Sequence, residues 1–353
     1  MNKFKLFLKK KNIDLSPKTY FITAMGAMAQ GLFASLLIGT IIKTIGEWFS
    51  LDFLLELAGF AMNGYVCGAA IGIAVASALK ATPLVLYSCA AVGACGYMVG
   101  TSVADVESLV TAGPAGAFLC VLVACEIGKL ESGSTKVDII ITPALTLLSG
   151  FAVAKLICPG VAYVMYYMGL FINTATELHP LVMGMIVSAL VGILLTLPIS
   201  SAAVCSMIGI AGLAGGAALA GCCCQMVGFA VMSFRENRVG GLIAQGLGTS
   251  MLQMGNIVKK PVIWLPPILA SIIAGPVATM VFRLECTGVS AGMGTCGLVG
   301  PLGAITAVAE KDLLFWVGLI VVCLILPAVL TLIFSEIMRK IGLIKKDDLK
   351  LEL

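Results

Sequence analysis

Charged residues are scarce in this chain, and histidine is almost absent. Asp, Glu, Lys and Arg make up 11% of the 353 residues, and there is one histidine, whereas roughly a quarter of a soluble domain is charged. A soluble protein with so little charge would expose large apolar patches and aggregate. A single histidine leaves little room for Ser-His-Asp or Cys-His catalysis. The chain is therefore expected to work in lipid, without a catalytic set, cofactor or metal of its own.

Apolar residues account for 60% of the sequence, and the mean hydropathy is +1.08. A membrane-spanning helix needs about 20 apolar residues, which predicts an all-α polytopic membrane protein. The plausible spans are residues 20–42, 57–79, 83–100, 113–128, 137–158, 181–200, 202–234, 262–282 and 313–338. Two more apolar stretches, residues 240–257 and 288–308, are interrupted by Gly or Pro.

Positive charge is concentrated near both ends of the sequence. The N-terminal cations are Lys3, Lys5, Lys9, Lys10, Lys11 and Lys18, and the C-terminal ones are Arg339, Lys340, Lys345, Lys346 and Lys350. Because positive flanks stay in the cytoplasm, both termini are expected there, in a multi-pass protein of the inner (plasma) membrane with an even number of spans. Such clusters could also contact anionic lipid, whereas nucleic-acid binding is not expected. No signal peptide is evident, so the first span is expected to be retained.

Thirteen cysteines lie mostly inside apolar runs, where a cysteine behaves as a small hydrophobe. The run Cys222-Cys223-Cys224 could suggest a metal site. Consecutive residues of a helix point in different directions, however, and the single histidine is far away in the sequence. The cysteines are therefore interpreted as packing residues.

The second half of the chain is the better place to seek a solute site. Charges recur there after short apolar pieces, which indicates broken helices or re-entrant hairpins. Irregular backbone persists at membrane depth only where protein or a water-filled cavity covers it. The expected division is a basic segment (1–19), an N-terminal transmembrane bundle (20–160), an amphipathic interfacial segment (161–180), a C-terminal transport region (181–338) and a cytoplasmic tail (339–353).

Three groups of polar residues are candidates for binding a solute. Glu177 and His179 lie at the mouth of the sixth span, where His179 could instead cap the helix that begins at Pro180. Gln253 and Asn256 are three residues apart and share a face if helical; their amides suit sugar-like hydroxyls, but they could also form an interfacial turn. Glu285 and Thr287 precede a glycine-rich stretch that suits a re-entrant loop, although Glu285 could simply pair with Arg283 or Arg238.

Several dispersed patterns resemble the EIIC membrane subunits of the sugar phosphotransferase system, nearest to the perfringolysin-regulator-like branch. They are GPAGA at 113–117, EIGK at 126–129, TKVDIIITP at 135–143, ELHP at 177–180, VIWLPP at 262–267 and GMGTCGLVG at 292–300. The resemblance covers roughly residues 15–340. It implies a homodimer of about ten spans with re-entrant hairpins, in which a hairpin-rich transport domain carries the sugar against a dimer scaffold.

In typical EIIC proteins a hairpin glutamate and a histidine bind sugar hydroxyls, and Glu285 and His179 are the matching positions here. The Gly-Ile-Thr-Glu-Pro hairpin motif of many EIICs is absent, which weakens the match for Glu285. EIIA and EIIB domains are not found in this sequence. Separate cytoplasmic subunits, EIIB among them, are expected to supply phosphotransfer, or this branch transports or regulates without it.

The leading hypothesis is a permease that moves a sugar or similar polar solute by alternating access. An alternative is an ion-coupled transporter of an organic acid or nucleoside, which needs a protonatable carboxylate such as Glu285 or Glu236. A third is a membrane-bound regulator that transports nothing. Uptake that depends on pH or sodium rather than on EIIB would favour the second, and a protein partner without solute flux would favour the third.

Overall fold

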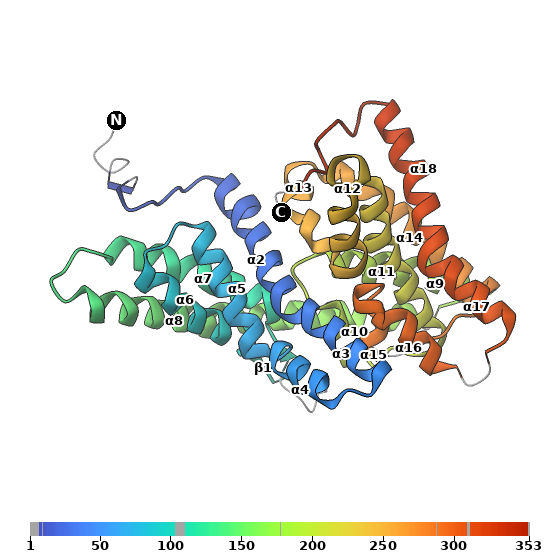
Figure 1. The fold of residues 1–353 in the computed structure, drawn as a ribbon, viewed down its shortest axis with the longest axis horizontal. Helices are drawn as coiled ribbons and strands as arrows, with labels where there is room; N and C mark the ends of the chain where they lie inside the picture. The colour runs from blue at the N-terminus through green and yellow to red at the C-terminus, as the bar shows by residue number, and fades with distance from the viewer. Residues whose placement is uncertain are drawn as a thin grey trace. The chain divides into compact units, whose positions relative to one another are not determined.

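The computed structural model describes residues 7–8, 10–102, 110–176, 178–286, 288–308 and 311–351. Helices dominate this part of the chain (Figure 1), and its strands β1 (Gly100–Thr101) and β2 (Val110–Thr111) form a single antiparallel pair. Helices satisfy their own backbone groups, which hydrocarbon cannot do. The prediction of an all-α polytopic membrane protein is confirmed.

Six helices in the described ranges are long and apolar enough to cross a membrane. They are Thr19–Glu47, Gly113–Glu131, Asp138–Thr176, Gly212–Met232, Pro261–Val281 and Leu313–Lys340. The pair Asp52–Ala61 and Gly64–Ala78, bent by 54°, would be a seventh if it forms one broken span. Pro83–Met98, Pro180–Thr196 and Cys296–Ala307 are apolar but shorter. The number of about ten crossings stays a prediction, because length alone does not decide whether these shorter helices cross.

The chain forms two compact units. Unit 1 consists of the residues up to Lys43 together with Leu51–Met165, and unit 2 of Thr44–Ser50 together with the residues from Tyr166 onward. The elements up to residue 176 are η1 (Thr19–Ala24), α2 (Met25–Leu32), η2 (Phe33–Leu37), α3 (Ile38–Phe49), α4 (Asp52–Ala61), α5 (Gly64–Ala78), α6 (Pro83–Met98), α7 (Gly113–Glu131) and α8 (Asp138–Thr176).

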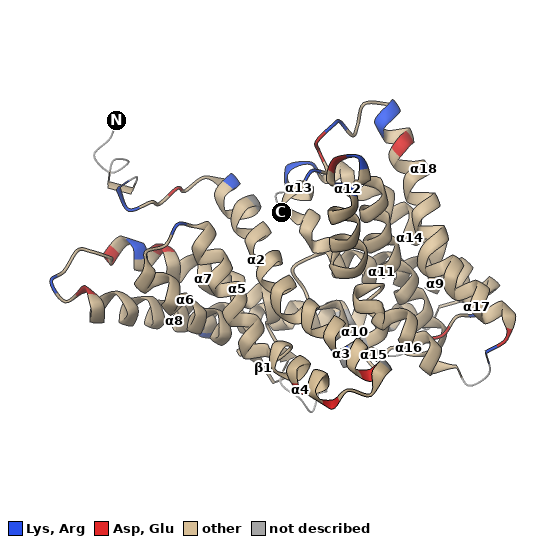
Figure 2. Ribbon diagram, in the orientation of Figure 1, with Lys and Arg blue, Asp and Glu red and all other residues tan. Residues whose placement is uncertain are grey.

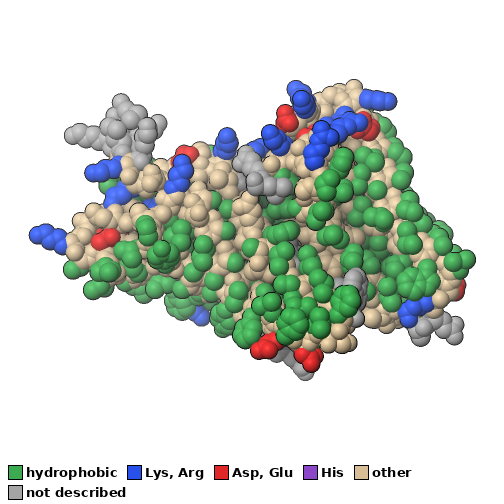
Figure 3. Space-filling model, in the orientation of Figure 1, with side chains coloured by type: hydrophobic (Ala, Val, Ile, Leu, Met, Phe, Trp, Pro, Cys, Tyr) green, Lys and Arg blue, Asp and Glu red, His purple; other side chains and the backbone are tan. Residues whose placement is uncertain are grey.

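Helix α8 differs from the expected arrangement of a span followed by a separate interfacial segment. It continues for 39 residues through Pro143 and Pro159. Pro143 and Pro159 both lie inside the helix, and a proline inside a membrane helix is tolerated when neighbouring groups satisfy the freed carbonyl. Many of its apolar side chains face outward, Leu156 being 82% exposed, as expected for contact with lipid. Hydrophobic side chains are likewise spread over the visible face of each unit (Figure 3).

Unit 2 combines regular helices with short irregular ones. Its elements from residue 180 are α9 (Pro180–Thr196), α10 (Ser201–Met207), α11 (Gly212–Met232), α12 (Phe234–Ile243), η3 (Ala244–Gly248), η4 (Ser250–Gln253), α13 (Met254–Lys259), η5 (Pro261–Trp264), α14 (Leu265–Pro276), η6 (Val277–Val281), α15 (Gly288–Ala291), η7 (Cys296–Leu298), α16 (Val299–Ala307), α17 (Leu313–Ile320), η8 (Val321–Ile325) and α18 (Leu326–Lys340).

Helix α11 is the core of unit 2 and packs on α9, α14 and α18. Its cysteines Cys222, Cys223 and Cys224 are fully buried, in agreement with a packing role. A methyl group at Gly221 would overlap the backbone of Ser188 on α9. Ser188 in turn donates to the Ser271 carbonyl of α14 at 2.7 Å. Small residues therefore bring three helix backbones together, as is common in membrane bundles.

Replacing Gly221 by alanine should destabilise unit 2. The added methyl group has to push α9 away from α11, and overpacking of this kind costs about 1–3 kcal/mol. Thermal unfolding of the detergent-purified protein would measure the loss. Gly160→Ala is the matched control, because a methyl group there meets nothing within 4 Å. Equal melting temperatures for the two variants would contradict the close packing of α9 on α11.

Candidate functional site

The segment from Ala244 to Lys260 in unit 2 changes helix type repeatedly. A π-helical turn, η3, is followed by Thr249 in an extended conformation with φ −158°. The 3-10 turn η4 and the short helix α13 come next, and Pro261 begins η5. Thr249 caps η4 by accepting from the Met251 amide at 3.1 Å. Because each break rotates the chain, polar side chains of this one segment reach two different surroundings.

The first surroundings are the buried polar groups around Gln225 of α11. The Gln225 Oε1 accepts from the Thr196 hydroxyl at 3.1 Å and from the Trp264 indole at 2.9 Å. The Thr196 hydroxyl also lies 2.8 Å from that of Ser250. Gln225, Thr196 and Ser250 are fully buried, and Trp264 is half-buried. We call these four residues the Gln225 cluster.

The amide nitrogen of Gln225 has no hydrogen-bond partner among the described residues. An indole only donates, so the atom that Trp264 contacts must be the carbonyl oxygen, and the Nε2 faces elsewhere. A buried donor without an acceptor costs about 1–3 kcal/mol. The cluster therefore holds a donor suited to a hydroxyl oxygen, next to an aromatic ring of the kind that packs against sugar faces.

The second surroundings contain the predicted pair Gln253 and Asn256, which the structure brings together. Asn256 Nδ2 donates to Gln253 Oε1 at 2.8 Å, and Gln253 Nε2 donates to Gln245 Oε1 at 2.9 Å. The two predicted side chains also bind the tail. Gln253 donates to the Leu349 carbonyl at 3.0 Å and Asn256 to the Lys350 carbonyl at 2.9 Å. In this conformation their amides are engaged by protein.

The other predicted residues lie apart from these clusters. His179 is exposed and is the N-cap of α9, its Nδ1 accepting from the Leu181 amide at 3.4 Å. Glu285 is exposed, in a loop whose Cys286 amide donates to the Gly212 carbonyl at 3.3 Å. Glu177 and Thr287 lie outside the described residues.

Sequence reasoning missed Gln225, Thr196 and Ser250. A signal for Gln225 was present, because it is the only amide in the apolar run of α11, and a polar group within a span calls for an explanation. The other two could not have been found, because their contacts join α9 and η4, which are 54 residues apart in the sequence.

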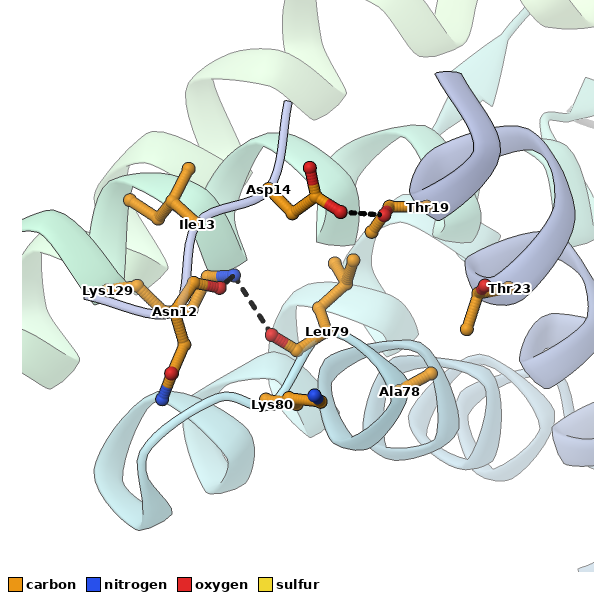
Figure 4. Close-up of a pocket in the computed structure, with 9 residues that line it drawn as sticks. All are labelled: Asn12, Ile13, Asp14, Thr19, Thr23, Ala78, Leu79, Lys80 and Lys129. Carbon is orange, nitrogen blue, oxygen red and sulfur yellow. Dashed lines mark hydrogen bonds between the residues drawn. The ribbon is translucent and has the colours of Figure 1, made fainter. Parts of the chain in front are cut away.

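A pocket of about 450 Å³ lies in unit 1 (Figure 4). Part of its polar lining is already engaged within the protein. Lys129 donates to the carbonyls of Asn12 and Leu79 and to Glu126, at 3.0, 2.9 and 3.0 Å. Asp14 accepts from Thr19 at 2.7 Å. The pocket holds none of the predicted site residues. We therefore regard Lys129 as a structural anchor for the N-terminal segment.

In the described part of the chain, no three His, Cys, Asp or Glu side chains are placed to hold a metal ion.

The sequence pattern of the family described as Phosphotransferase system, EIIC matches residues 22–351. The chain belongs to this family. The predicted membership of the EIIC family is thereby confirmed, while the assignment to the perfringolysin-regulator-like branch stays a prediction. No curated protein and no solved structure matches the chain. As an EIIC protein, it is a multi-pass integral membrane permease for sugars.

The ion pair between Lys260 of this EIIC protein and Asp348 of the tail should make tail binding pH-dependent. Burial alone raises the pKa of Asp348, but the hydrogen bond from Lys260, 2.6 Å long, helps to hold that pKa below its usual 3.8. The ionised carboxylate therefore stabilises the bound tail above about pH 3.8, and this contribution disappears as the pH falls through the lower bound-state pKa.

Tail-amide protection, measured by hydrogen exchange and corrected for intrinsic rates, should thus be equal at pH 7 and pH 5 and should fall only below about pH 3.8. Lys260→Gln should reduce this acid dependence, the remainder coming from the Lys345 amide, which donates to the same carboxylate at 2.6 Å. A loss of protection between pH 7 and pH 5 would contradict the assignment to Asp348.

Proposed function

We propose that this EIIC protein moves a sugar by alternating access and contacts it through the Gln225 cluster of unit 2. The observation that carries the proposal is the unpartnered Gln225 Nε2 among buried hydroxyls and a tryptophan. Sugar hydroxyls both donate and accept, so they match a set that contains an amide donor and hydroxyl groups. That the solute is a sugar follows from the family, and in this proposal the Gln225 cluster binds its hydroxyl groups.

The broken segment beside the cluster supports a moving element. Ser250 begins the 3-10 turn η4, which lies between the extended Thr249 and the six-residue helix α13, and irregular elements near a site often absorb conformational change. The closely packed α9, α11 and α14 would remain rigid while η3, η4 and α13 shift. The Lys and Arg residues of α12, α13 and the end of α18 gather at one end of unit 2 (Figure 2). We assign that end to the cytoplasm, where positive charge is retained and a separate EIIB subunit would act.

The ion-coupled alternative gains less support. Of the carboxylates it would use, Glu236 pairs with Arg339 at 2.9 Å, and Glu285 is exposed in a loop. One carboxylate oxygen of Glu236 is therefore already held in an ion pair within the protein. Uptake that follows a proton or sodium gradient without EIIB would nevertheless establish this alternative.

Sugar binding by Gln225→Met and Thr196→Val tests the proposal. Each change removes polar groups while nearly preserving side-chain volume, and losing one or two hydrogen bonds should weaken binding about 10- to 100-fold. Wild type is first screened by thermal shift against hexoses, hexitols, amino sugars, disaccharides, sugar acids and nucleosides. Binding of the best ligand is then measured by titration calorimetry.

Thr331→Val is the matched control, because Thr331 is buried in the same unit, on α18, and its hydroxyl has no partner among described residues. This variant should bind like wild type. His179→Ala and Glu285→Ala test the positions suggested by the family pattern. Loss of binding in these two, with full binding by Gln225→Met, would overturn the proposal and place the sugar at the exposed positions.

A further inference from the structure

The tail, residues 341–351, folds back onto unit 2 after α18. Gly342, with φ +82°, reverses the chain, and the Leu343 amide donates to the Met338 carbonyl at 2.9 Å. Such a left-handed glycine is a common end of a helix. Most of the tail is exposed, but Ile344 is 2% and Leu349 is 0% exposed. Two apolar side chains therefore anchor an otherwise polar segment.

The backbone of the tail is held by side-chain amides rather than by a strand or helix. Asn237 of α12 donates to the Leu349 carbonyl and accepts from the Leu351 amide, both at 2.8 Å. Gln253 donates to the same Leu349 carbonyl, and Asn256 donates to the carbonyl of Lys350. The Lys260 ammonium lies 2.6 Å from the Asp348 carboxylate. Four side chains thus hold residues 348–351, and three of them belong to the broken segment.

A strained residue lies next to one of these four side chains. Arg238, directly after Asn237, has φ +52° and ψ −151° inside α12. A residue with a side chain rarely adopts this conformation, and it persists only where surrounding contacts hold it. The tail contacts of Asn237 are contacts of this kind, so a released tail would leave Arg238 free to relax.

We propose that the tail is a releasable latch that holds the broken segment and thereby controls the Gln225 cluster. Docked, it fixes Gln253 and Asn256. Gln253 lies on η4 together with Ser250, and Asn256 follows on α13. Ser250 contacts Thr196, which donates to Gln225. Release of the tail frees η4 and α13 to move, and Ser250 moves with them. Hydrogen bonds that exchange for bonds to water contribute little net stability each, so the latch is reversible.

The assignment of the cluster to sugar binding rests on the proposed function, whereas tail docking and its coupling to the cluster do not. The test therefore needs no sugar. Trp264 lies in the cluster, and Trp48→Phe with Trp316→Phe leaves it as the single tryptophan. Its emission reports the cluster, while hydrogen exchange measured by mass spectrometry reports residues 341–351 and 244–260 of the full chain.

In this background, Asp348→Lys puts two ammonium groups together and should release the tail. We expect about tenfold faster exchange in the tail, the change that corresponds to about 1.4 kcal/mol, together with faster exchange in 250–259 and a shifted Trp264 emission. Adding Lys260→Asp restores opposite charges and should recover most of all three signals. Asn237→Leu, which removes two hydrogen bonds to the tail without changing charge, should repeat the effects of Asp348→Lys.

Two results would overturn the latch. Unprotected tail amides in wild type would show that the tail is not docked. Faster tail exchange in Asp348→Lys and Asn237→Leu, with residues 250–259 and Trp264 unchanged, would show that the tail is docked but uncoupled from the cluster. Failure of Gln225→Met to weaken sugar binding would refute the sugar site alone and would leave these measurements intact.

Discussion

Hydrocarbon offers a buried polar group no water, so each such group needs a partner inside the protein. Regular helices meet this requirement for their backbone, and most of the chain is built from them. Between Ala244 and Lys260 the helix is broken, and Thr249, Gln245, Gln253 and Asn256 supply the missing partners through their side chains. Unit 2 has polar side chains in its interior because this segment, not being one regular helix, cannot pair all its backbone N–H and C=O groups with one another.

The irregular segment lies beside helices α9, α11 and α14, which are closely packed on one another. Gly221 brings α11 against α9, and Ser188 ties α9 to α14 through the Ser271 carbonyl. Close backbone contacts of this kind resist sliding. The side chains of η3, η4 and α13, by contrast, are held by hydrogen bonds that can be exchanged. Unit 2 thus joins a fixed three-helix core to a replaceable set of polar contacts, an arrangement suited to a permease.

The tail and the Gln225 cluster are both bound by side-chain hydrogen bonds from one short segment, residues 250–256. Ser250 contacts the buried Thr196 hydroxyl, whereas Gln253 and Asn256 donate to the backbone carbonyls of residues 349 and 350. Only one 3-10 turn and the start of α13 separate them. Because so few residues separate the two sites, a displacement of the tail-binding residues should also move Ser250.

The sequence by itself determined that the protein lies in a membrane, that it is all-α and that it belongs to the EIIC family. Hydropathy and local motifs are properties of contiguous residues and can be read without the fold. It also placed Gln253 and Asn256 on one face, since a spacing of three is decided locally. Tertiary structure alone decided that these amides hold the tail, and that Gln225 meets Thr196, Ser250 and Trp264. Those contacts join residues 29 to 96 positions apart, and only the packing of α9, α11 and the broken segment brings them within hydrogen-bonding distance.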